Sequence, residues 1–265
     1  MTRQAVSRHH VLDATRIVVK VGSSSVTGAN VGQIEPLVDA LVAAHQRGVE
    51  VVLVSSGAIA SAMASLNLDG RPQDLATQQA AAAVGQNVLM WRYQTSLDRY
   101  GILAGQVLLT AGDLENPTHR SNAQRAMERL LDLRILPIVN ENDTVATQEI
   151  RFGDNDRLAA LVSELIGADL LVLLSDIDAL YTRPPGEPGA RPIAHVPFDD
   201  DLAGIELGDI GAAGVGTGGA GTKIAAAKHA AATGTPVLLT STANVALALA
   251  GADTGTWFDA APSAE

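Results

Sequence analysis

The stretch "DNDRLAALVSELIGADLLVLLSDIDALY", residues 154–181, decides the fold class. Its first part, 154–168, spaces its apolar residues as a helix with one buried face does. The following run "LLVLLS" (170–175) is almost entirely apolar. A strand without alternation of polar and apolar residues is typical of a parallel sheet that helices cover on both faces.

The same alternation of helical and β-rich segments runs along most of the chain. We expect strands at 16–21, 49–54, 102–109, 135–140, 170–175 and 236–240, and helices at 33–48, 57–66, 74–100, 119–133, 154–168 and 222–234. Segment 74–100 is predicted as one or two helices, with Gly85 as a possible break. The proline- and glycine-rich segment 182–196 predicts a surface hairpin or lid. These elements predict an α/β fold, a three-layer α/β/α sandwich around a mostly parallel open sheet.

Composition narrows the classes of protein. The chain has 265 residues, 47% of them hydrophobic and 3% aromatic, which suits an aliphatic core. We expect one domain at 15–258, an extended or disordered tail at 1–14 and a short tail at 259–265. The formal net charge of −11 argues against nucleic acid or an anionic membrane as the main partner. The chain contains no cysteine, so thiol chemistry is excluded and a cytoplasmic location is expected.

No apolar run reaches the ~20 residues of a membrane-spanning helix, so we expect no membrane segment. In open parallel sheets the functional site lies beyond the carboxyl ends of the strands. Small, polar or acidic residues follow four predicted strands: Gly22 to Ser24, Ser55 to Gly57, Asn140 to Asp143, and Ser175 with Asp176. Together they predict a polar site at this edge of the sheet.

Lys20 is the first candidate catalytic residue. It lies in or at the end of a buried strand, where a lysine is costly unless it meets an anion. The alternative is a lysine that extends from an edge strand into solvent. Gly22 offers a backbone N–H group to the same anion.

Two further segments allow both a structural and a functional interpretation. Ser56 either caps the helix that follows it or belongs to an anion-binding turn. The segment "NENDTVATQEIRFGDND" (140–156) is either a solvated acidic loop or part of the site. In the second case Asp143 pairs with a substrate ammonium, Asn155 donates to a carboxylate, and Asp156 orders nearby lysines or assists a metal.

The glycine-rich stretch "GVGTGGAGTK" (214–223) is similar to a P-loop but does not match one. In a P-loop the lysine follows the last glycine directly, whereas Lys223 comes one position later and no strand precedes the stretch. A flexible linker is the alternative. The glycines still permit close approach to a phosphate, with Lys223 in the first turn of the next helix.

Six motifs, in this order, resemble the amino acid kinase family: "VVKVGSSSVT", "VSSGAI", "LPIVNENDTVAT", "FGDND", "LLSDIDALY" and "GTGGAGTK". The resemblance covers roughly residues 15–258. It is specific for the branch that phosphorylates the side-chain carboxylate of L-glutamate to γ-glutamyl phosphate, the first step of proline synthesis. It implies ATP and Mg²⁺, with Mg²⁺ bound mainly through ATP and without dedicated protein ligands.

The resemblance also implies roles by motif position. Lys20, Lys223 and Asp156 would be catalytic, and Ser56, Asp143 and Asn155 would bind glutamate. The ATP-binding residues would be Lys20, Gly22, Ser175, Asp176, Thr217, Gly218, Gly219, Ala220, Gly221, Thr222 and Lys223. Proline is expected as a feedback inhibitor, glutamyl phosphate reductase as the next enzyme, and a homo-oligomer as the assembly.

This sequence departs from the family pattern in two ways. Many members carry a C-terminal PUA domain, whereas this chain ends soon after "GTWF" (255–258), which leaves regulation and assembly open. Ala220 replaces a usual methionine and Ala179 a usual glycine, with small effects expected. Two alternatives remain: a related kinase for another carboxylate such as N-acetylglutamate, or a non-catalytic nucleotide-binding protein of the same fold.

Overall fold

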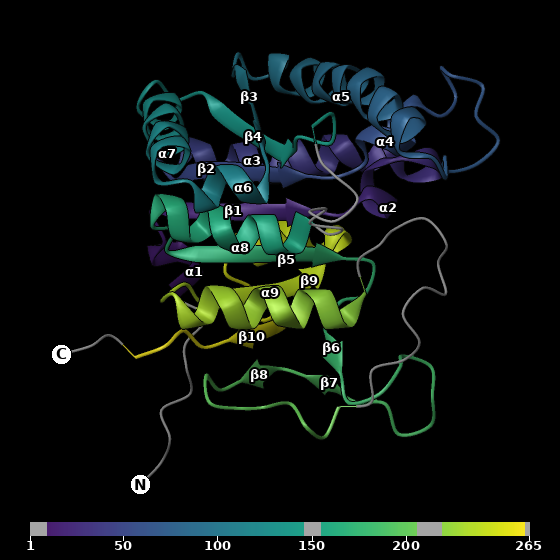
Figure 1. Cartoon of the computed structure of the whole chain (residues 1–265). Helices are drawn as coiled ribbons and strands as arrows, with labels where there is room; N and C mark the ends of the chain where they lie inside the picture. Colours follow the sequence, from purple (N-terminus) through teal and green to yellow (C-terminus); the bar gives the residue numbers. More distant parts are fainter. Residues whose placement is uncertain (1–9, 146–154, 206–218, 263–265) are drawn as a thin grey trace, which may run out of the picture.

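An eight-stranded sheet forms the centre of the computed structural model, which describes residues 10–145, 155–205 and 219–262 (Figure 1). Its strands, in spatial order, are β3 (Ala104–Leu109), β4 (Leu136–Glu141), β2 (Glu50–Ser55), β1 (Arg16–Val21), β5 (Leu170–Ser175), β9 (Val237–Ser241), β10 (Thr256–Phe258) and β8 (His195–Val196). The β9–β10 pair is antiparallel and the other pairs are parallel. The predicted fold class, an α/β fold with a mostly parallel sheet, is confirmed.

Helices cover both faces of this sheet. One apolar core lies between the sheet and α1 (His10–Asp13), α3 (Ile34–Gln46), α5 (Leu75–Asp98) and α10 (Val245–Leu249). The other lies under α6 (Ala111–Glu115), α7 (Pro117–Asp132), α8 (Asn155–Ile166) and α9 (Ala220–Ala232). Successive residues of β1 alternate between the two cores, with Ile17 and Val19 in the first and Val18 in the second. This arrangement is the three-layer sandwich expected from the apolar strands.

Of the two alternatives for segment 74–100, the structure shows the single helix: α5 has 24 residues and continues through Gly85 without a break. It begins after Asp74, whose side chain accepts a hydrogen bond from the Thr77 N–H at 2.9 Å. Gly85 instead faces α4 (Ala58–Ala62), where any β-carbon would overlap the carbonyl oxygen of Ala58. The glycine permits the close approach of the two helices.

The predicted hairpin forms around segment 182–196: β6 (Leu180–Tyr181), just before this segment, pairs with β7 (Pro192–Ile193), within it, in antiparallel fashion. The tail boundary predicted at residue 14 is corrected, because α1 packs on the first core through Val11, which is 1% exposed. Asp169 ties that end of the chain to the sheet. It accepts hydrogen bonds from Thr15 N at 2.7 Å, Thr15 Oγ1 at 2.8 Å and Arg16 N at 2.8 Å.

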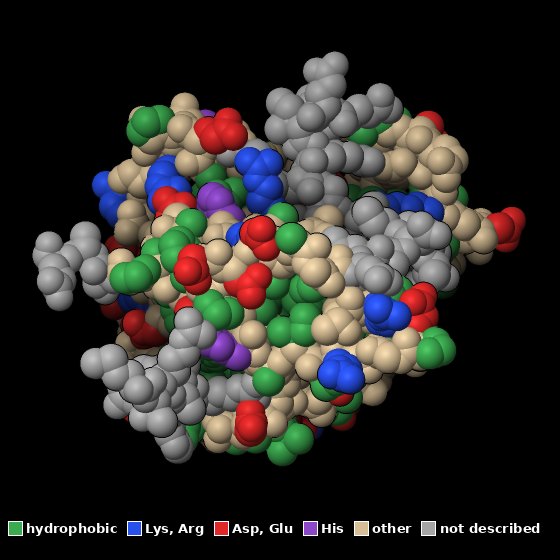
Figure 2. Space-filling view, turned by 90° about the horizontal axis from the view of Figure 1, so that it is seen from below, with side chains coloured by type: hydrophobic (Ala, Val, Ile, Leu, Met, Phe, Trp, Pro, Cys, Tyr) green, Lys and Arg blue, Asp and Glu red, His purple; other side chains and the backbone are tan. Residues whose placement is uncertain are grey.

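Three short helices complete the described structure: α2 (Ser23–Val26), η1 (Gly28–Gln33) and η2 (Thr242–Asn244). Within the described ranges, no helix is both long and apolar enough to cross a membrane. On the face seen in Figure 2, lysine and arginine side chains are scattered among acidic and apolar ones and do not form a continuous basic patch. The carboxyl ends of β1, β2, β4 and β5 meet at one edge of the sheet, where the candidate site lies.

Candidate active site

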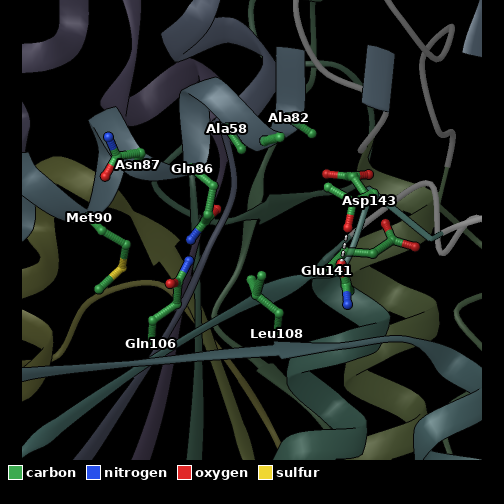
Figure 3. Close-up of a pocket in the computed structure, with 12 residues that line it drawn as sticks. Ala58, Ala82, Gln86, Asn87, Met90, Gln106, Leu108, Glu141 and Asp143 are labelled. Atoms are coloured by element: carbon green, nitrogen blue, oxygen red, sulfur yellow. Dashed lines mark hydrogen bonds between the residues drawn. The ribbon is translucent and has the colours of Figure 1, made fainter. Parts of the chain in front are cut away.

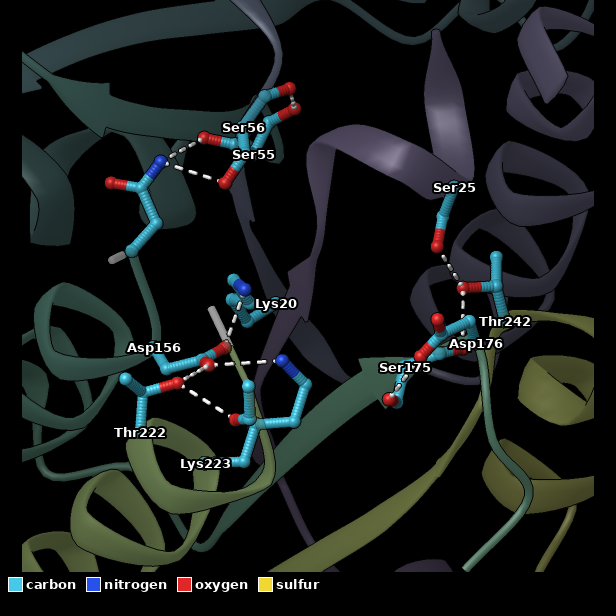
Figure 4. A network of polar contacts seen from close by, with 12 residues as sticks. Lys20, Ser25, Ser55, Ser56, Asp156, Ser175, Asp176, Thr222, Lys223 and Thr242 are labelled. Atoms are coloured by element: carbon cyan, nitrogen blue, oxygen red, sulfur yellow. Dashed lines mark hydrogen bonds and ion pairs between the residues drawn. The ribbon is translucent and has the colours of Figure 1, made fainter. Parts of the chain in front are cut away.

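Two buried lysines share one buried carboxylate at the centre of this edge (Figure 4). Lys20 comes from β1, paired in register between β2 and β5, and is 2% exposed. Asp156, in the first turn of α8, is fully buried and forms ion pairs with Lys20 and with Lys223 of α9, the latter at 3.1 Å. Because the three side chains together carry a net charge of +1, the cluster favours an anionic ligand.

The start of α9 holds Lys223 in place. The Thr222 hydroxyl lies 2.9 Å from the carbonyl oxygen of Gly219 and 3.3 Å from Asp156 Oδ2. The first N–H groups of a helix attract anions, and α9 presents this end beside the lysines. Gly219, Ala220, Gly221 and Thr222 therefore lie where the sequence predicted the nucleotide loop. Thr217 and Gly218, predicted for the same loop, lie outside the described residues.

Asn155 connects three elements of the neighbouring polar pocket. Its Nδ2 group donates to Ser55 O at 2.9 Å, to Ser56 Oγ at 2.9 Å and to Asn140 Oδ1 at 2.8 Å. The helix-capping interpretation of Ser56 is not supported, because the cap residue of α4 is Gly57, with φ of +100°. Ser56 instead accepts a hydrogen bond from Asn155 beside the lysine cluster.

The direction of the hydrogen bonds defines what this pocket offers a ligand. Asn140 Oδ1 also accepts from the Glu141 N–H at 2.9 Å, so Asn140 must direct its Nδ2 to Gln86 Oε1, at 2.7 Å. Asn155 Oδ1 is buried and has no hydrogen-bond partner among the described residues. The prediction that Asn155 donates to a carboxylate is therefore corrected: its remaining group is an acceptor, which suits an ammonium.

Tyr93 of α5 contacts Ser55, the residue of β2 whose carbonyl group binds Asn155. Its hydroxyl lies 2.8 Å from Ser55 Oγ, and both side chains are fully buried. Burial raises the pKa of Tyr93, and the hydrogen bond with Ser55 only partly opposes this. The hydroxyl is therefore neutral, and it fixes the end of β2 whose carbonyl group accepts from Asn155.

A cavity of about 210 Å³ opens beside this pocket (Figure 3). Asp143, predicted to bind glutamate, lines it, as do Gln86 from α5 and Leu108 from β3. The remaining lining residues are Ala58, Ala82, Ala83, Asn87, Met90, Gln106, Glu141, Asn142 and Thr144. The structure thus places Asp143, Ser56 and Asn155 around the same edge of the sheet, next to the lysine cluster.

A second polar cluster lies across the lysines from Ser56 (Figure 4). The Ser175 hydroxyl donates to Asp176 Oδ1 at 3.1 Å, and the Thr242 hydroxyl donates to Ser25 Oγ at 2.9 Å. Gly22 lies beside the cations, since a β-carbon there would be 4.0 Å from Lys20 Nζ. These residues lie at or just beyond the carboxyl ends of β1, β5 and β9, and Gly22, Ser175 and Asp176 among them were predicted to bind ATP.

Sequence reasoning gave no role to four residues of these networks: Gln86, Tyr93, Ser25 and Thr242. Thr242 directly follows β9, so the rule that found Ser175 and Asp176 would have found it too. Gln86 and Tyr93 lie within an ordinary-looking helix, and no local pattern distinguishes them. Among the described residues, no group of three or more His, Asp or Glu side chains is arranged to hold a metal.

The sequence of the chain is similar to those of known proteins. Residues 15–241 match the family described as "Amino acid kinase family". A protein from Clavibacter sepedonicus named glutamate 5-kinase is 74% identical over 252 residues, covering 95% of this chain and 97% of that protein. Glutamate 5-kinase from Leifsonia xyli is 70% identical, covering 97% and 95%. The one from Streptomyces coelicolor is 56% identical, covering 97% of this chain and 70% of the longer relative.

The fold also has a match among solved structures. Carbamate kinase from Giardia lamblia bound to AMP-PNP superimposes with a TM-score of 0.67 and 17% identity, covering 94% of this chain and 99% of that one. At this identity the match concerns the fold alone. The family match and the full-length relatives go further: this chain belongs to the amino acid kinase family, within the group of glutamate 5-kinases.

Proposed function

We propose that the protein transfers the γ-phosphoryl group of ATP to the side-chain carboxylate of L-glutamate and forms γ-glutamyl phosphate, the first step of proline synthesis. The observation that carries the proposal is the buried cluster of Lys20, Asp156 and Lys223 beside the pocket of Ser56, Asn155 and Asp143. The relatives named glutamate 5-kinase, at 70–74% identity over nearly their whole length, support the choice of substrate.

The chemistry requires positioning more than proton transfer. A glutamate side chain has a pKa of about 4.3, so its carboxylate is already a nucleophile at neutral pH and needs no general base. The barrier comes from bringing this anion to the negatively charged γ-phosphate. Lys20 and Lys223 lower that repulsion and stabilise charge on the transferred group, while Asp156 fixes their positions.

The pocket beside the lysines fits the other end of the substrate. Asp143 carries the charge that an α-ammonium requires, and Asn155 Oδ1 adds a hydrogen-bond acceptor without a partner among the described residues. Ser56 is held by Asn155 at the entrance of α4. An amino acid bound by these groups directs its side-chain carboxylate toward the lysine cluster.

The nucleotide fits on the opposite side. Gly22 and the first turn of α9 lie beside the lysines, and Ser175 and Asp176 lie at the end of the neighbouring strand β5. Both carboxylate oxygens of Asp156 form ion pairs with lysines, so Asp156 is not available as a direct ligand of Mg²⁺. The residues present therefore fit a Mg²⁺ ion that is bound through the phosphates of ATP. When bound, this ion would supply further neutralisation of phosphate charge. Proline inhibition, a subsequent reductase, a homo-oligomer and a cytoplasmic location extend the proposal on family resemblance.

The test compares two alanine variants with a matched control. Lys20→Ala and Lys223→Ala should each lower kcat by about a hundredfold or more, with a smaller effect on the glutamate KM. Lys228→Ala is the control, because Lys228 lies on the same helix but is exposed and bonds only to the Asp201 carbonyl oxygen, at 2.9 Å, among the described residues. Wild-type turnover in either active-site variant would refute the roles assigned to these lysines.

The same assay separates the alternatives. ATP consumption and trapping of the acyl phosphate with hydroxylamine are measured with glutamate, with N-acetylglutamate and without an acceptor. Glutamate-dependent trapping supports the proposal. Preference for N-acetylglutamate indicates a related kinase, and nucleotide binding without turnover indicates a non-catalytic protein.

A further inference from the structure

A buried amide hydrogen-bond donor faces the cavity that Asp143 lines and has no partner among the described residues. Gln86 lies on α5 and is 7% exposed, and its Nε2 group makes no hydrogen bond within the described part of the chain. Gln86 lines the cavity that Asp143 also lines, and Figure 3 shows its amide directed toward Gln106 across that space. Since a buried polar group without a partner costs about 1–3 kcal/mol, a bound ligand is the expected partner.

The orientation of this amide follows from a backbone group. The Glu141 N–H can only donate, and it donates to Asn140 Oδ1 at 2.9 Å. Asn140 therefore turns its Nδ2 group to Gln86, which must present Oε1, at 2.7 Å. The Nε2 group is left for the cavity. Gln86 thus offers a donor, and a flipped amide would break the bond from Asn140.

We propose that Gln86 is a specificity-determining residue, whose Nε2 group binds the α-carboxylate of the amino acid substrate. The relay Gln86–Asn140–Asn155 leaves a donor at one end and an acceptor, Asn155 Oδ1, at the other. A zwitterionic α-amino acid presents the complementary pair, a carboxylate and an ammonium, and Asp143 adds negative charge for the ammonium. This inference rests on the proposed function and adds the group that recognises the α-carboxylate.

The variant Gln86→Glu tests the donor and preserves most of the relay. The new carboxylate keeps an oxygen for Asn140 Nδ2 but replaces the donor with a negatively charged acceptor. We expect the glutamate KM and the calorimetric Kd for glutamate to rise about ten- to a hundredfold, as for the loss of a hydrogen bond to a charged group. The ATP KM should stay within about threefold, and kcat should change less than the glutamate KM.

Asn87→Asp is the matched control for charge, because Asn87 is the next residue of α5 and lines the same cavity. It adds the same negative charge without touching the relay, so its glutamate KM should rise several times less. An equal rise in both variants would show that charge in the cavity, and not the Gln86 donor, causes the effect. That result would overturn the inference.

A second measurement changes the substrate. The compound 4-aminobutanoate has the ammonium and the reacting carboxylate of glutamate but lacks the α-carboxylate. The ratio of kcat/KM for glutamate to that for 4-aminobutanoate should fall at least tenfold in Gln86→Glu. Gln86→Met, which keeps the length of the side chain without charge, should lower the ratio too and serves if the first variant does not fold.

The proposed function and the role of Gln86 can be refuted separately. If the wild-type protein shows no glutamate-dependent turnover, the proposed function fails and this inference with it. If the wild-type protein is active but the substrate ratio is unchanged in folded Gln86→Glu and Gln86→Met, only the inference fails. In that case Gln86 acts on the pocket through Asn140 alone.

Discussion

Replacing Asp156 with asparagine removes the charge that Lys20 and Lys223 share while preserving the shape of the side chain. Asp156 is fully buried, and the lysines are 2% and 7% exposed. At the 3.1 Å between Lys223 Nζ and Asp156 Oδ2, Coulomb's law with an effective dielectric constant of 20 gives about 5 kcal/mol of gross attraction. Desolvation offsets part of it, and removal of one partner of a buried pair typically costs about 3–5 kcal/mol.

We therefore expect Asp156→Asn to lower the free energy of unfolding by about 3–5 kcal/mol, which corresponds to a fall in Tm on the order of 10 °C for a chain of this size. The variant should also lose at least about a hundredfold in kcat, because the lysines lose their fixed positions. ATP should raise its Tm more than that of the wild-type protein, since the phosphates replace the missing negative charge.

Thermal unfolding with and without ATP measures both effects, and Asp132→Asn is the control. Asp132 forms an exposed pair with Arg129 at 3.8 Å on the surface of α7, so its replacement should cost less than about 1 kcal/mol. If Asp156→Asn matches the wild-type protein in Tm and turnover, the shared carboxylate does not organise the cluster. An equal effect of ATP on both proteins would show that the phosphates do not reach the lysines.

Three further predictions concern the surroundings of the site. Gly85→Ala should lower the free energy of unfolding by at least about 1–3 kcal/mol and raise the glutamate KM, because the methyl group displaces Ala58 at the start of α4. An unchanged denaturant unfolding curve would contradict this prediction. Tyr93→Phe should cost about 1 kcal/mol through the lost hydrogen bond to Ser55, and chemical denaturation with equal m values would measure it. Asp169 has a pKa below its usual 3.8, since hydrogen bonds at the start of β1 together outweigh burial, the largest single effect, which raises it. Its stabilising contribution is present above pH ~4 and is lost as pH falls through the folded pKa. The difference in Tm between Asp169→Asn and the wild-type protein should therefore be present at pH 7 and shrink as pH falls through the folded pKa of Asp169.

The sheet could be predicted from sequence because its strands are buried on both faces. The run 170–175 coincides with β5, and 16–21 coincides with β1. Burial of the strands also explains why the position of Lys20 was informative, since a cation in an apolar strand needs an anion nearby. The antiparallel strand β10 was not predicted, because three residues are too few to show a pattern.

The polar relay could not be predicted because its bonds join distant positions. Asn140 bonds to Gln86, 54 residues away, and Tyr93 contacts Ser55, 38 residues away. Gln86 and Tyr93 occupy ordinary positions in α5. Their partners, Asn140 and Ser55, belong to β4 and β2 and are reached only when α5 packs against these strands. The role of Gly85 was left open for the same reason: a contact with α4, not local backbone geometry, requires the glycine.

The late position of Lys223 follows from how the lysine cluster is built. A P-loop gathers its glycines, its lysine and the start of its helix in one continuous segment. Here the cations come from a strand, β1, and from a separate helix, α9, and Asp156 of a third element, α8, binds both. Lys223 therefore lies at the end of the first turn of α9, from where its side chain reaches Asp156 at the start of α8. Because the site depends on three elements and one carboxylate, its geometry is set by the packing of the whole sheet edge. A substitution at Asp156 should consequently disturb the positions of both cations together, whereas loss of either lysine leaves the other paired.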